Sequence, residues 1–552
     1  MAHALPRRLR LVAFLALAAS RVAGSADTGG NITQKPLSAH PFPPGKTMFA
    51  HLSPEETGIR TENAYDDPRM WGDLYQEFEV GSIGTGVAIG DFDGDGRPDI
   101  FVVSKTGRCW LFRNLGGYRF EDVTEKAGVG GASGVWTQGA TFVDINNSGR
   151  LDIYVCRFNA PNLLYINQGN GTFKEMAHAY GLDVVDASVQ ASFCDYDRDG
   201  WLDLYLVTNL LDIARHPHGE ADYLFHNNRN GTFTNVTDRA GISGPGQGHS
   251  ATWWDYDNDG WPDLYVANDF GTPDKLYRNN GDGTFTDILD GALPHTSFSS
   301  MGADVGDVRN DGFVDLLVAD MARTTHQGDQ RTEAASRSKA MDPPDNSSAA
   351  MKYERNALLV NTGTGRALEA AHLAGIAATD WTWSVRLEDF DNDGHLDLFV
   401  TNGMNREQNN VDILSRTMSA ETPADRIRIM HDSPVLAQAH RAYRAVGDLQ
   451  FEDVSKQWGL DQKGVAFGAA TGDLSGDGNL DLVYSNYGEG VTVLRNDLAQ
   501  GHVVNVDLRG TLSNRYGVGA TVTVESALGS QVRPLWLARG YMSSSEPMVH
   551  FG

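Results

Sequence analysis

The stretch Asp91-Phe92-Asp93-Gly94-Asp95-Gly96-Arg97-Pro98-Asp99 decides the fold, because its pattern returns six more times along the chain. Oxygen-bearing side chains recur at positions 1, 3, 5 and 9 of the nine residues, with Gly at position 6. Hard cations such as Ca²⁺ take roughly six to eight oxygen ligands, and alternate carboxylates around a tight Gly turn supply most of them. The repeat therefore predicts a set of Ca²⁺-binding loops. The later copies begin at Asp144, Asp195, Asp255, Asp307, Asp389 and Asp473.

Short apolar runs flank the acidic loops. Val87-Ala88-Ile89 precedes the first loop, and Ile100-Phe101-Val102-Val103 follows it. Runs of β-branched and aromatic residues bounded by Gly and Asp favour strands over helices. The strands exclude an EF-hand, which needs flanking helices and a Glu at position 12 of its loop.

The spacing of the loops indicates how the strands are organised. The loop starts lie 53, 51, 60, 52, 82 and 84 residues apart. Turns such as Asn280-Gly281 follow the second strand of a repeat and favour hairpins. Four short strands per repeat at a period of about 50 residues are typical of β-propeller blades. Two repeats carry insertions, near 323–353 and 406–443. The first, rich in Ser, Asp and Pro, predicts a loop, and the second favours helix over 424–430 and 436–439.

A second repeating element sets the number of blades. A Phe followed nine residues later by an aliphatic residue after Gly occurs downstream of most loops, as from Phe120 to Val129, but not after the seventh. An orphan copy lies near the N-terminus, from Phe49 to Ile59. We therefore predict an all-β chain with a seven-bladed β-propeller over residues 47–500, in which residues 47–59 complete the last blade. Ring closure removes exposed sheet edges; an open solenoid with free ends is the alternative.

The N-terminus predicts export. Arg7, Arg8 and Arg10 precede an apolar run over 11–19, and small residues follow at 23–26. This is the pattern of a secretory signal peptide, here over 1–24, with a linker over 25–46. An uncleaved anchor is the alternative, although the apolar run is shorter than the ~20 residues that span a bilayer. We expect a secreted or extracellular protein, or a periplasmic or cell-surface one in a bacterial host.

Composition excludes some partners. The chain has 72 Asp and Glu against 45 Lys and Arg, for a net charge of −27. Nucleic-acid binding needs basic patches, so nucleic acid is not an expected partner. The three cysteines, Cys109, Cys156 and Cys194, are too few for a disulfide scaffold and lie in strand-like runs. We expect them to behave as small buried hydrophobic residues.

The seven loops differ in their ligands, and ligand charge helps to set affinity for Ca²⁺. One loop has Arg309 at position 3, whose guanidinium has no acceptor atom. We expect Arg309 to take the place of the cation by pairing with Asp307, Asp311 or Asp315, which leaves about six Ca²⁺ sites. The four loops with Asp at every ligand position should bind most tightly: Asp91, Asp93, Asp95 and Asp99; Asp195, Asp197, Asp199 and Asp203; Asp255, Asp257, Asp259 and Asp263; and Asp389, Asp391, Asp393 and Asp397. Two loops should bind more weakly: Asp144, Asn146, Ser148 and Asp152; and Asp473, Ser475, Asp477 and Asp481.

Polar residues also recur at the ends of the second strands, five residues after position 9 of each loop. Equivalence of the repeats would place them in a ring at one end of the central channel, where one ligand could meet several blades. The alternative is that strands simply end in solvent and carry polar residues there. The predicted ligand-binding residues, one of them adjacent to its strand end, are Arg157, Asn209, Asn268, Asp320, Asn402 and Asn486.

The repeats resemble the FG-GAP or VCBS type, whose members form integrin-α-like propellers with Ca²⁺ in the same loops. The stretches over 514–524 and 539–547 and the final His550-Phe551-Gly552 resemble an ASPIC/UnbV domain. Together they are similar to the cartilage acidic protein-like family, which implies extracellular Ca²⁺ binding and interaction without an established chemistry. In the family the last stretch continues into further strand, so we expect a small, partial β domain over 501–552.

Two functions remain open at this point. The leading reading is a secreted, Ca²⁺-stabilised propeller that binds an extracellular protein or glycan as an adhesion or scaffold module. The alternative is a carbohydrate-active enzyme, a polysaccharide lyase or hydrolase, on the same scaffold. The chain has no His-Glu-x-x-His or Gly-x-Ser-x-Gly motif, so we assign no catalytic residues. No membrane insertion is expected after signal cleavage.

Overall fold

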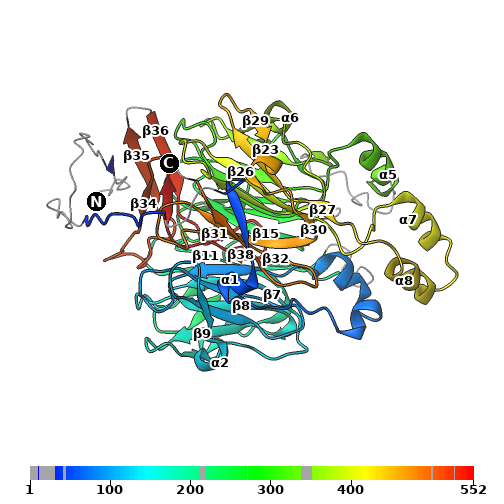
Figure 1. Cartoon of the computed structure of the whole chain (residues 1–552), viewed down its shortest axis with the longest axis horizontal. Helices are drawn as coiled ribbons and strands as arrows, with labels where there is room; N and C mark the ends of the chain where they lie inside the picture. Colours follow the sequence, from blue (N-terminus) through cyan, green and yellow to red (C-terminus); the bar gives the residue numbers. More distant parts are fainter. Residues whose placement is uncertain are drawn as a thin grey trace.

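The computed structural model describes residues 10–11, 32–40, 45–211, 219–242, 244–269, 272–336, 351–498, 501–526 and 529–552. Short antiparallel strands dominate these residues, and the longer helices lie together at one side (Figure 1). Most of the predicted signal peptide lies outside the described residues. No helix in the described part of the chain is long and apolar enough to cross a membrane.

The acidic loops join the first and second strands of four-stranded antiparallel units. Seven such units occur in the described residues. The first three are β3 (Val87–Gly90), β4 (Asp99–Val102), β5 (Trp110–Asn114) and β6 (Phe120–Asp122); β7 (Thr137–Val143), β8 (Asp152–Pro161), β9 (Leu163–Asn167) and β10 (Phe173–Glu175); and β11 (Val185–Cys194), β12 (Asp203–Thr208), β13 (Tyr223–Asn227) and β14 (Phe233–Asn235). The next two are β15 (Gly248–Trp254), β16 (Asp263–Asn268), β17 (Lys275–Asn279) and β18 (Phe285–Asp287); and β20 (Ala303–Gly306), β21 (Asp315–Val318), β23 (Ala357–Asn361) and β24 (Ala367–Glu369). The last two are β25 (Thr382–Glu388), β26 (Asp397–Asn402), β28 (Arg441–Ala445) and β29 (Phe451–Asp453); and β31 (Ala466–Gly472), β32 (Asp481–Asn486), β33 (Thr492–Asn496) and β2 (Phe49–Leu52).

The first strands of the units follow one another around a ring. β3 contacts β7, β7 contacts β11, and the contacts continue through β15, β20 and β25 to β31, which contacts β3 again. β2 pairs antiparallel with β33, with Phe49 opposite Asn496 and Leu52 opposite Val493. The predicted β-propeller and its closure by the N-terminal segment are therefore confirmed.

A short helix after the fourth strand explains the repeated Phe and Gly pattern. Phe120 begins β6 and is buried, and α2 (Thr124–Ala127) follows it. The helix ends at Gly128, whose φ of 77° is left-handed and favours Gly. Val129 then enters the core with no exposed surface. The equivalent short helices are α1 (Pro54–Thr57), α3 (Ala177–Tyr180), α4 (Leu289–Ala292), α6 (Ala371–Ala374) and α9 (Ser455–Trp458).

Both insertions contain helix. α8 (Pro423–His431) confirms the helix predicted over 424–430, and α7 (Val411–Met418) precedes it. The helix predicted over 436–439 is wrong, because Gln438 and Ala439 pair as a strand with Gly464 and Lys463. The prediction of a loop for the first insertion is wrong in part, because α5 (His326–Ser336) occupies it. The Thr325 hydroxyl accepts the Gly328 N–H at 3.1 Å just before this helix, a local start signal that the polar composition obscured. The other short elements are β1 (Arg10–Leu11), η1 (Pro68–Trp71), η2 (Glu77–Gly81), β19 (His295–Ser297), β22 (Met351–Tyr353), β27 (Gln438–Ala439) and β30 (Lys463–Gly464).

The C-terminal unit packs a small core of its own. Its strands are β34 (Val504–Val506), β35 (Thr521–Ser526), β36 (Gly529–Pro534) and β39 (Val549–Phe551), with the short β37 (Ala538–Arg539) and β38 (Ser543–Ser544) between the last two. Val522, Leu535, Val549 and Phe551 form the core. These strands lie within the small β domain that the sequence predicts over 501–552.

Residues 538–546, which we call the channel segment, lie inside the ring of first strands. β38 contacts β3, β7 and β31, and β37 contacts β11 and β15. Met542 O accepts the Ala140 N–H at 3.3 Å, and Gly540 N donates to Ala303 O at 2.9 Å. A Cβ atom at Gly86 would lie 1.8 Å from Met542 O, so only Gly permits this approach. The channel segment therefore fills part of the central channel.

Candidate metal centres

The carboxylate at position 1 shapes all seven acidic loops. Its Oδ2 accepts the N–H of the position-6 Gly at 2.7–3.0 Å in every copy. Those glycines have a positive φ throughout. The loop fold thus depends on position 1 and the Gly, and it persists whatever occupies positions 3 and 5. This is why the Arg309 loop folds like the others.

The carboxylate at position 9 ties each loop to the third strand. Asp99 is fully buried; its Oδ1 accepts the Asn114 N–H at 2.7 Å, and its Oδ2 accepts the Phe92 N–H at 3.0 Å. Burial raises the pKa of Asp99 to about 8, and the equivalent Asp263 has its pKa raised to about 8 for the same reason. A bound divalent cation would oppose this effect, because it favours the ionised carboxylate.

Three carboxylates converge in each of four loops, from positions 1, 3 and 9 in three of them and from positions 1, 3 and 5 in the loop that begins at Asp255. The ligand atoms of each group lie within 4.8 Å of one another. Among the described residues these four loops are the ones predicted to be strongest, and the loops that begin at Asp144, Asp307 and Asp473 form no such group. The all-oxygen groups are Asp91, Asp93 and Asp99; Asp195, Asp197 and Asp203; Asp255, Asp257 and Asp259; and Asp389, Asp391 and Asp397.

Several loop oxygens are buried and make no hydrogen bond within the described part of the chain. They include Oδ1 of Asp197, Asp255 and Asp391, Oδ2 of Asp203, and Oγ of Ser475. A buried polar atom without a partner is costly, by about 1–3 kcal/mol. A hard cation is a partner suited to such oxygens, so the donor sets fit Ca²⁺.

Basic side chains of the third strands also reach the loops. Arg113 Nε lies 2.6 Å from Asp93 Oδ2, and Arg444 Nη2 lies 2.7 Å from Asp393 Oδ2. These arginines are more than one-third exposed, so the pairs are screened by solvent and contribute little. They neutralise part of the loop charge and leave the buried oxygens without a partner.

Arg309 occupies its loop as expected. Its Nη1 lies 2.8 Å from Asp311 Oδ2, and its Nη2 lies 3.5 Å from Asp315 Oδ1. The same Nη2 donates to Asn361 O at 2.6 Å. The guanidinium therefore bridges the loop and the third strand, and the predicted pairing with Asp311 and Asp315 is confirmed.

The two loops predicted to be weaker are held by other contacts. Ser148 N donates to Asn146 Oδ1 at 3.1 Å, and both residues stay near the surface. In the last loop, His40 Nδ1 lies 2.5 Å from Asp477 Oδ2, and Asn505 Nδ2 donates to Asp473 Oδ2 at 3.1 Å. The C-terminal unit and the N-terminal linker thus both touch the loop that begins at Asp473.

Asparagines at the ends of the third strands join neighbouring units by hydrogen bonds, which we call clasps. The sequence analysis did not predict this role for them. Asn279 Nδ2 donates to Tyr196 O in the preceding acidic loop at 2.8 Å and to Pro262 O in its own loop at 3.1 Å. Asn114 Nδ2 reaches Leu474 O at 2.8 Å, which joins the first unit to the last. The other clasps are made by Asn167, Asn227, Asn361 and Asn496, and the sixth unit has Ala445 at this position. The recurring Asn before a Gly turn was the available signal.

The predicted ring of strand-end residues lies opposite the acidic loops and is mostly occupied by local bonds. Asn209 is the exception: it has no exposed surface, and neither polar atom of its amide has a hydrogen-bond partner among the described residues. The others bond nearby backbone: Arg157 Nε to Pro161 O, Asn268 Oδ1 to Gln247 N, Asp320 Oδ2 to Phe298 N, and Asn486 Nδ2 to Gly490 O.

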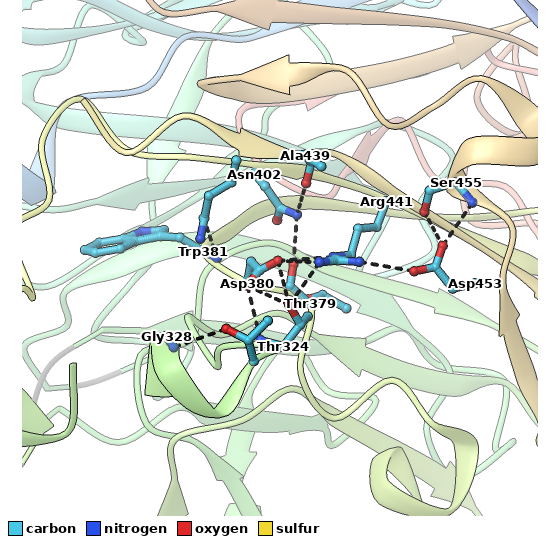
Figure 2. A network of polar contacts seen from close by, with 12 residues as sticks. Thr324, Gly328, Thr379, Asp380, Trp381, Asn402, Ala439, Arg441, Asp453 and Ser455 are labelled. Atoms are coloured by element: carbon cyan, nitrogen blue, oxygen red, sulfur yellow. Dashed lines mark hydrogen bonds and ion pairs between the residues drawn. The ribbon is translucent and has the colours of Figure 1, made fainter. Parts of the chain in front are cut away.

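Asn402 shows the same use of polar atoms in a larger network (Figure 2). Its amide donates to Thr379 O at 2.8 Å and to Ala439 O at 2.7 Å. Arg441 lies beside it, with Nη2 2.7 Å from Asp380 Oδ2 (Figure 2). The network fastens the turns of the sixth unit and leaves no free donor on Asn402.

The three cysteines are free and buried. Burial raises the pKa of the Cys109 thiol to about 12, which keeps it protonated and unreactive. The expectation of small buried hydrophobic residues is confirmed.

Comparison with known proteins identifies two family models in the chain. The FG-GAP-like repeat matches residues 91–155, 144–206, 209–266, 255–318 and 344–400, and the ASPIC and UnbV model matches 510–552. Cartilage acidic protein 1 of Homo sapiens is 27% identical over 351 residues, which cover 58% of this chain and 48% of that protein. The chain thus spans about half the length of this relative.

Two solved structures show a distant likeness. A lectin of Agrocybe aegerita has a TM-score of 0.37 at 15% identity, over 68% of this chain and 84% of that one. A rhamnogalacturonan lyase of Bacillus licheniformis has a TM-score of 0.39 at 10% identity, over 79% of this chain and 74% of that one.

Proposed function

Because this chain belongs to the FG-GAP-like repeat family and carries an ASPIC and UnbV unit, we propose that it is an exported, Ca²⁺-stabilised seven-bladed β-propeller acting as an extracellular binding or scaffold module. The observation that carries the proposal is the set of buried loop oxygens without a hydrogen-bond partner in the described residues. These oxygens lie mainly in loops whose ligand atoms already converge within 4.8 Å. The seven four-stranded units supply the seven blades.

The ligands of Ca²⁺ would come from positions 1, 3, 5 and 9 of each loop. Bound Ca²⁺ would neutralise clustered carboxylates and hold the first two strands of a blade to the third. An external habitat supports this role, because millimolar Ca²⁺ there can fill weak sites. The ion acts as a structural clamp, since every blade has the loop whereas one binding site would not need seven.

The binding face is proposed at the strand ends opposite the loops. The C-terminal unit covers loops of several blades, and Asn209 at the other end keeps an amide without a partner among the described residues. The name of the human relative connects that protein to cartilage. An extracellular protein or glycan is therefore the proposed partner.

Calcium content and thermal unfolding test the metal part. The chain, treated with EDTA and returned to Ca²⁺, should hold about six Ca²⁺ and melt at a higher temperature than the stripped form. Asp257→Arg, which copies position 3 of the Arg309 loop, should lower the calcium count by one, whereas Asp311→Asn, in the Arg309 loop itself, should leave it unchanged. A melting temperature that stays the same after EDTA treatment and after the return of Ca²⁺ would show that the loops need no metal.

A glycan and matrix-protein array with Ca²⁺ present tests the binding part. Asn486→Ala, at a strand end that is partly exposed, should weaken capture of the ligand that the unaltered chain binds, and the exposed Asn280→Ala should not. A product assay on each glycan hit addresses the alternative of a polysaccharide-cleaving enzyme. Intact sugar recovered from the complex supports the module, and shortened sugar supports the enzyme.

A further inference from the structure

The loop that begins at Asp195 has an imidazole where its relatives have a guanidinium. The residue before the clasping position is His226 here, whereas it is Arg113, Arg278, Arg444 and Arg495 in four other units, of which the sixth has Ala445 in place of the Asn. His226 Nδ1 lies 3.2 Å from Asp203 Oδ1 and 3.3 Å from Asp197 Oδ2. This nitrogen is buried and makes no hydrogen bond to any residue that the structure describes. An imidazole nitrogen can ligate a metal, and a guanidinium cannot.

The position-9 carboxylate also differs in this loop alone. In the six other loops its Oδ2 accepts the N–H of position 2 at 2.8–3.2 Å. The corresponding Oδ2 of Asp203 is buried and unpartnered within the described ranges, on a side chain that is 1% exposed. Asp197 Oδ1 is also buried and has no hydrogen-bond partner among the described residues. Two oxygens of this loop and the neighbouring His226 Nδ1 are therefore buried without a hydrogen-bond partner among the described residues.

The donor set joins one nitrogen to several oxygens. Asp197, Asp199 and His226 place ligand atoms within 4.8 Å of one another, and so do Asp195, Asp197 and Asp203. Ca²⁺ prefers oxygen ligands alone. Imidazole with carboxylates suits first-row divalent cations, of which Zn²⁺ binds His nitrogen and carboxylate oxygen at about 2.0–2.2 Å.

We propose that the Asp195 loop is a transition-metal site of the Zn²⁺ class, with His226 Nδ1, Asp197 and Asp203 as ligands. The proposal rests on the proposed function only for the use of these loops as metal sites, and it assigns one of the six loops to Zn²⁺ in place of Ca²⁺. Arg229 holds Asp199 through Nε at 2.7 Å from Oδ2, so Asp199 is engaged elsewhere. The competing arrangement is an imidazolium that pairs with the carboxylates as Arg309 does.

Metal retention in excess Ca²⁺ tests the proposal. The full chain in millimolar Ca²⁺ is incubated with Zn²⁺ or Co²⁺, dialysed, and assayed for metal content and for the Co²⁺ absorption band. We expect one retained equivalent in the unaltered chain. His226→Arg, which installs the side chain that other units carry, should lower affinity at least tenfold, and His226→Gln serves as a second variant. Circular dichroism and calcium content confirm that both variants fold.

The outcomes separate this site from the calcium proposal. Absence of retained Zn²⁺ and Co²⁺ from the unaltered chain overturns the transition-metal site, whatever the calcium count. Equal retention by both His226 variants also overturns it, because the metal must then sit elsewhere. Loss of the equivalent in the variants with unchanged Ca²⁺ supports it, and it would still stand if Ca²⁺ proved to be absent from the other loops.

Discussion

Replacing Asn279 by Ala removes a clasp between the third and fourth units. The side chain is 2% exposed and makes three hydrogen bonds: it donates to Tyr196 O at 2.8 Å and to Pro262 O at 3.1 Å, and it accepts from Gly281 N at 2.9 Å. At about 1 kcal/mol for each bond, the free energy of unfolding should fall by about 3 kcal/mol. At about 2 cal/mol/K of unfolding entropy per residue, a ring of this size should then melt about 3 °C lower.

Differential scanning calorimetry in saturating Ca²⁺ measures this shift. The matched control is Asn280→Ala: the adjacent side chain is exposed and bonds only surface Thr hydroxyls, so its loss should change the free energy by under about 0.5 kcal/mol. The reciprocal change, Ala445→Asn, supplies the clasp missing from the sixth unit and should add about 1 kcal/mol. Identical melting of the two Ala variants would refute the clasp as a source of ring stability.

Arg309→Asp restores a ligand to the fifth loop and should raise the Ca²⁺ count by one, whereas Arg309→Ala should not; an unchanged count in the Asp variant contradicts this. His440 is buried, and burial lowers its pKa to about 4, so the unfolded chain takes up this proton first as the pH falls below about 6.5. Chemical denaturation should therefore show the free energy of unfolding fall by about 2 kcal/mol between pH 7 and pH 5. His440→Asn should make the free energy of unfolding depend less on pH over this range. Gly86→Ala drives a Cβ against Met542 O; protease digestion should then release the C-terminal unit faster, while Gly464→Ala, which meets open space, should leave the rate unchanged.

The fold could be predicted because its determinants are local. The acidic loop, its Gly turn and the flanking strands lie within about twenty residues, and their repetition makes each copy a check on the others. Closure by the N-terminal segment was readable because Phe49 begins an orphan copy of an element that the seventh unit lacks. The loop expected around His326 failed because a helix without an apolar stripe resembles a polar linker.

The clasps and the channel segment could not be predicted, because they join positions far apart in the chain. Asn114 bonds a carbonyl 360 residues away. The need for Gly at position 86 becomes clear only from the close approach of Met542 O in the folded chain. The strand-end ring was predicted from position alone. Whether an amide such as Asn402 faces a ligand or its own turn depends on loop geometry that one sequence does not reveal. The unpartnered amide of Asn209 and the unpartnered ring nitrogen of His226 become visible only in the three-dimensional structure.

The closure by β2 imposes an order on biogenesis. Its residues are made first, yet their partner strand β33 follows only near the end of the ring. Until then β2 has no strand to pair with, and the Leu474 carbonyl that Asn114 needs is itself made only shortly before β33. The ring must therefore stay open until β33 is made. A pause in synthesis before β33 would leave β2 without its partner strand.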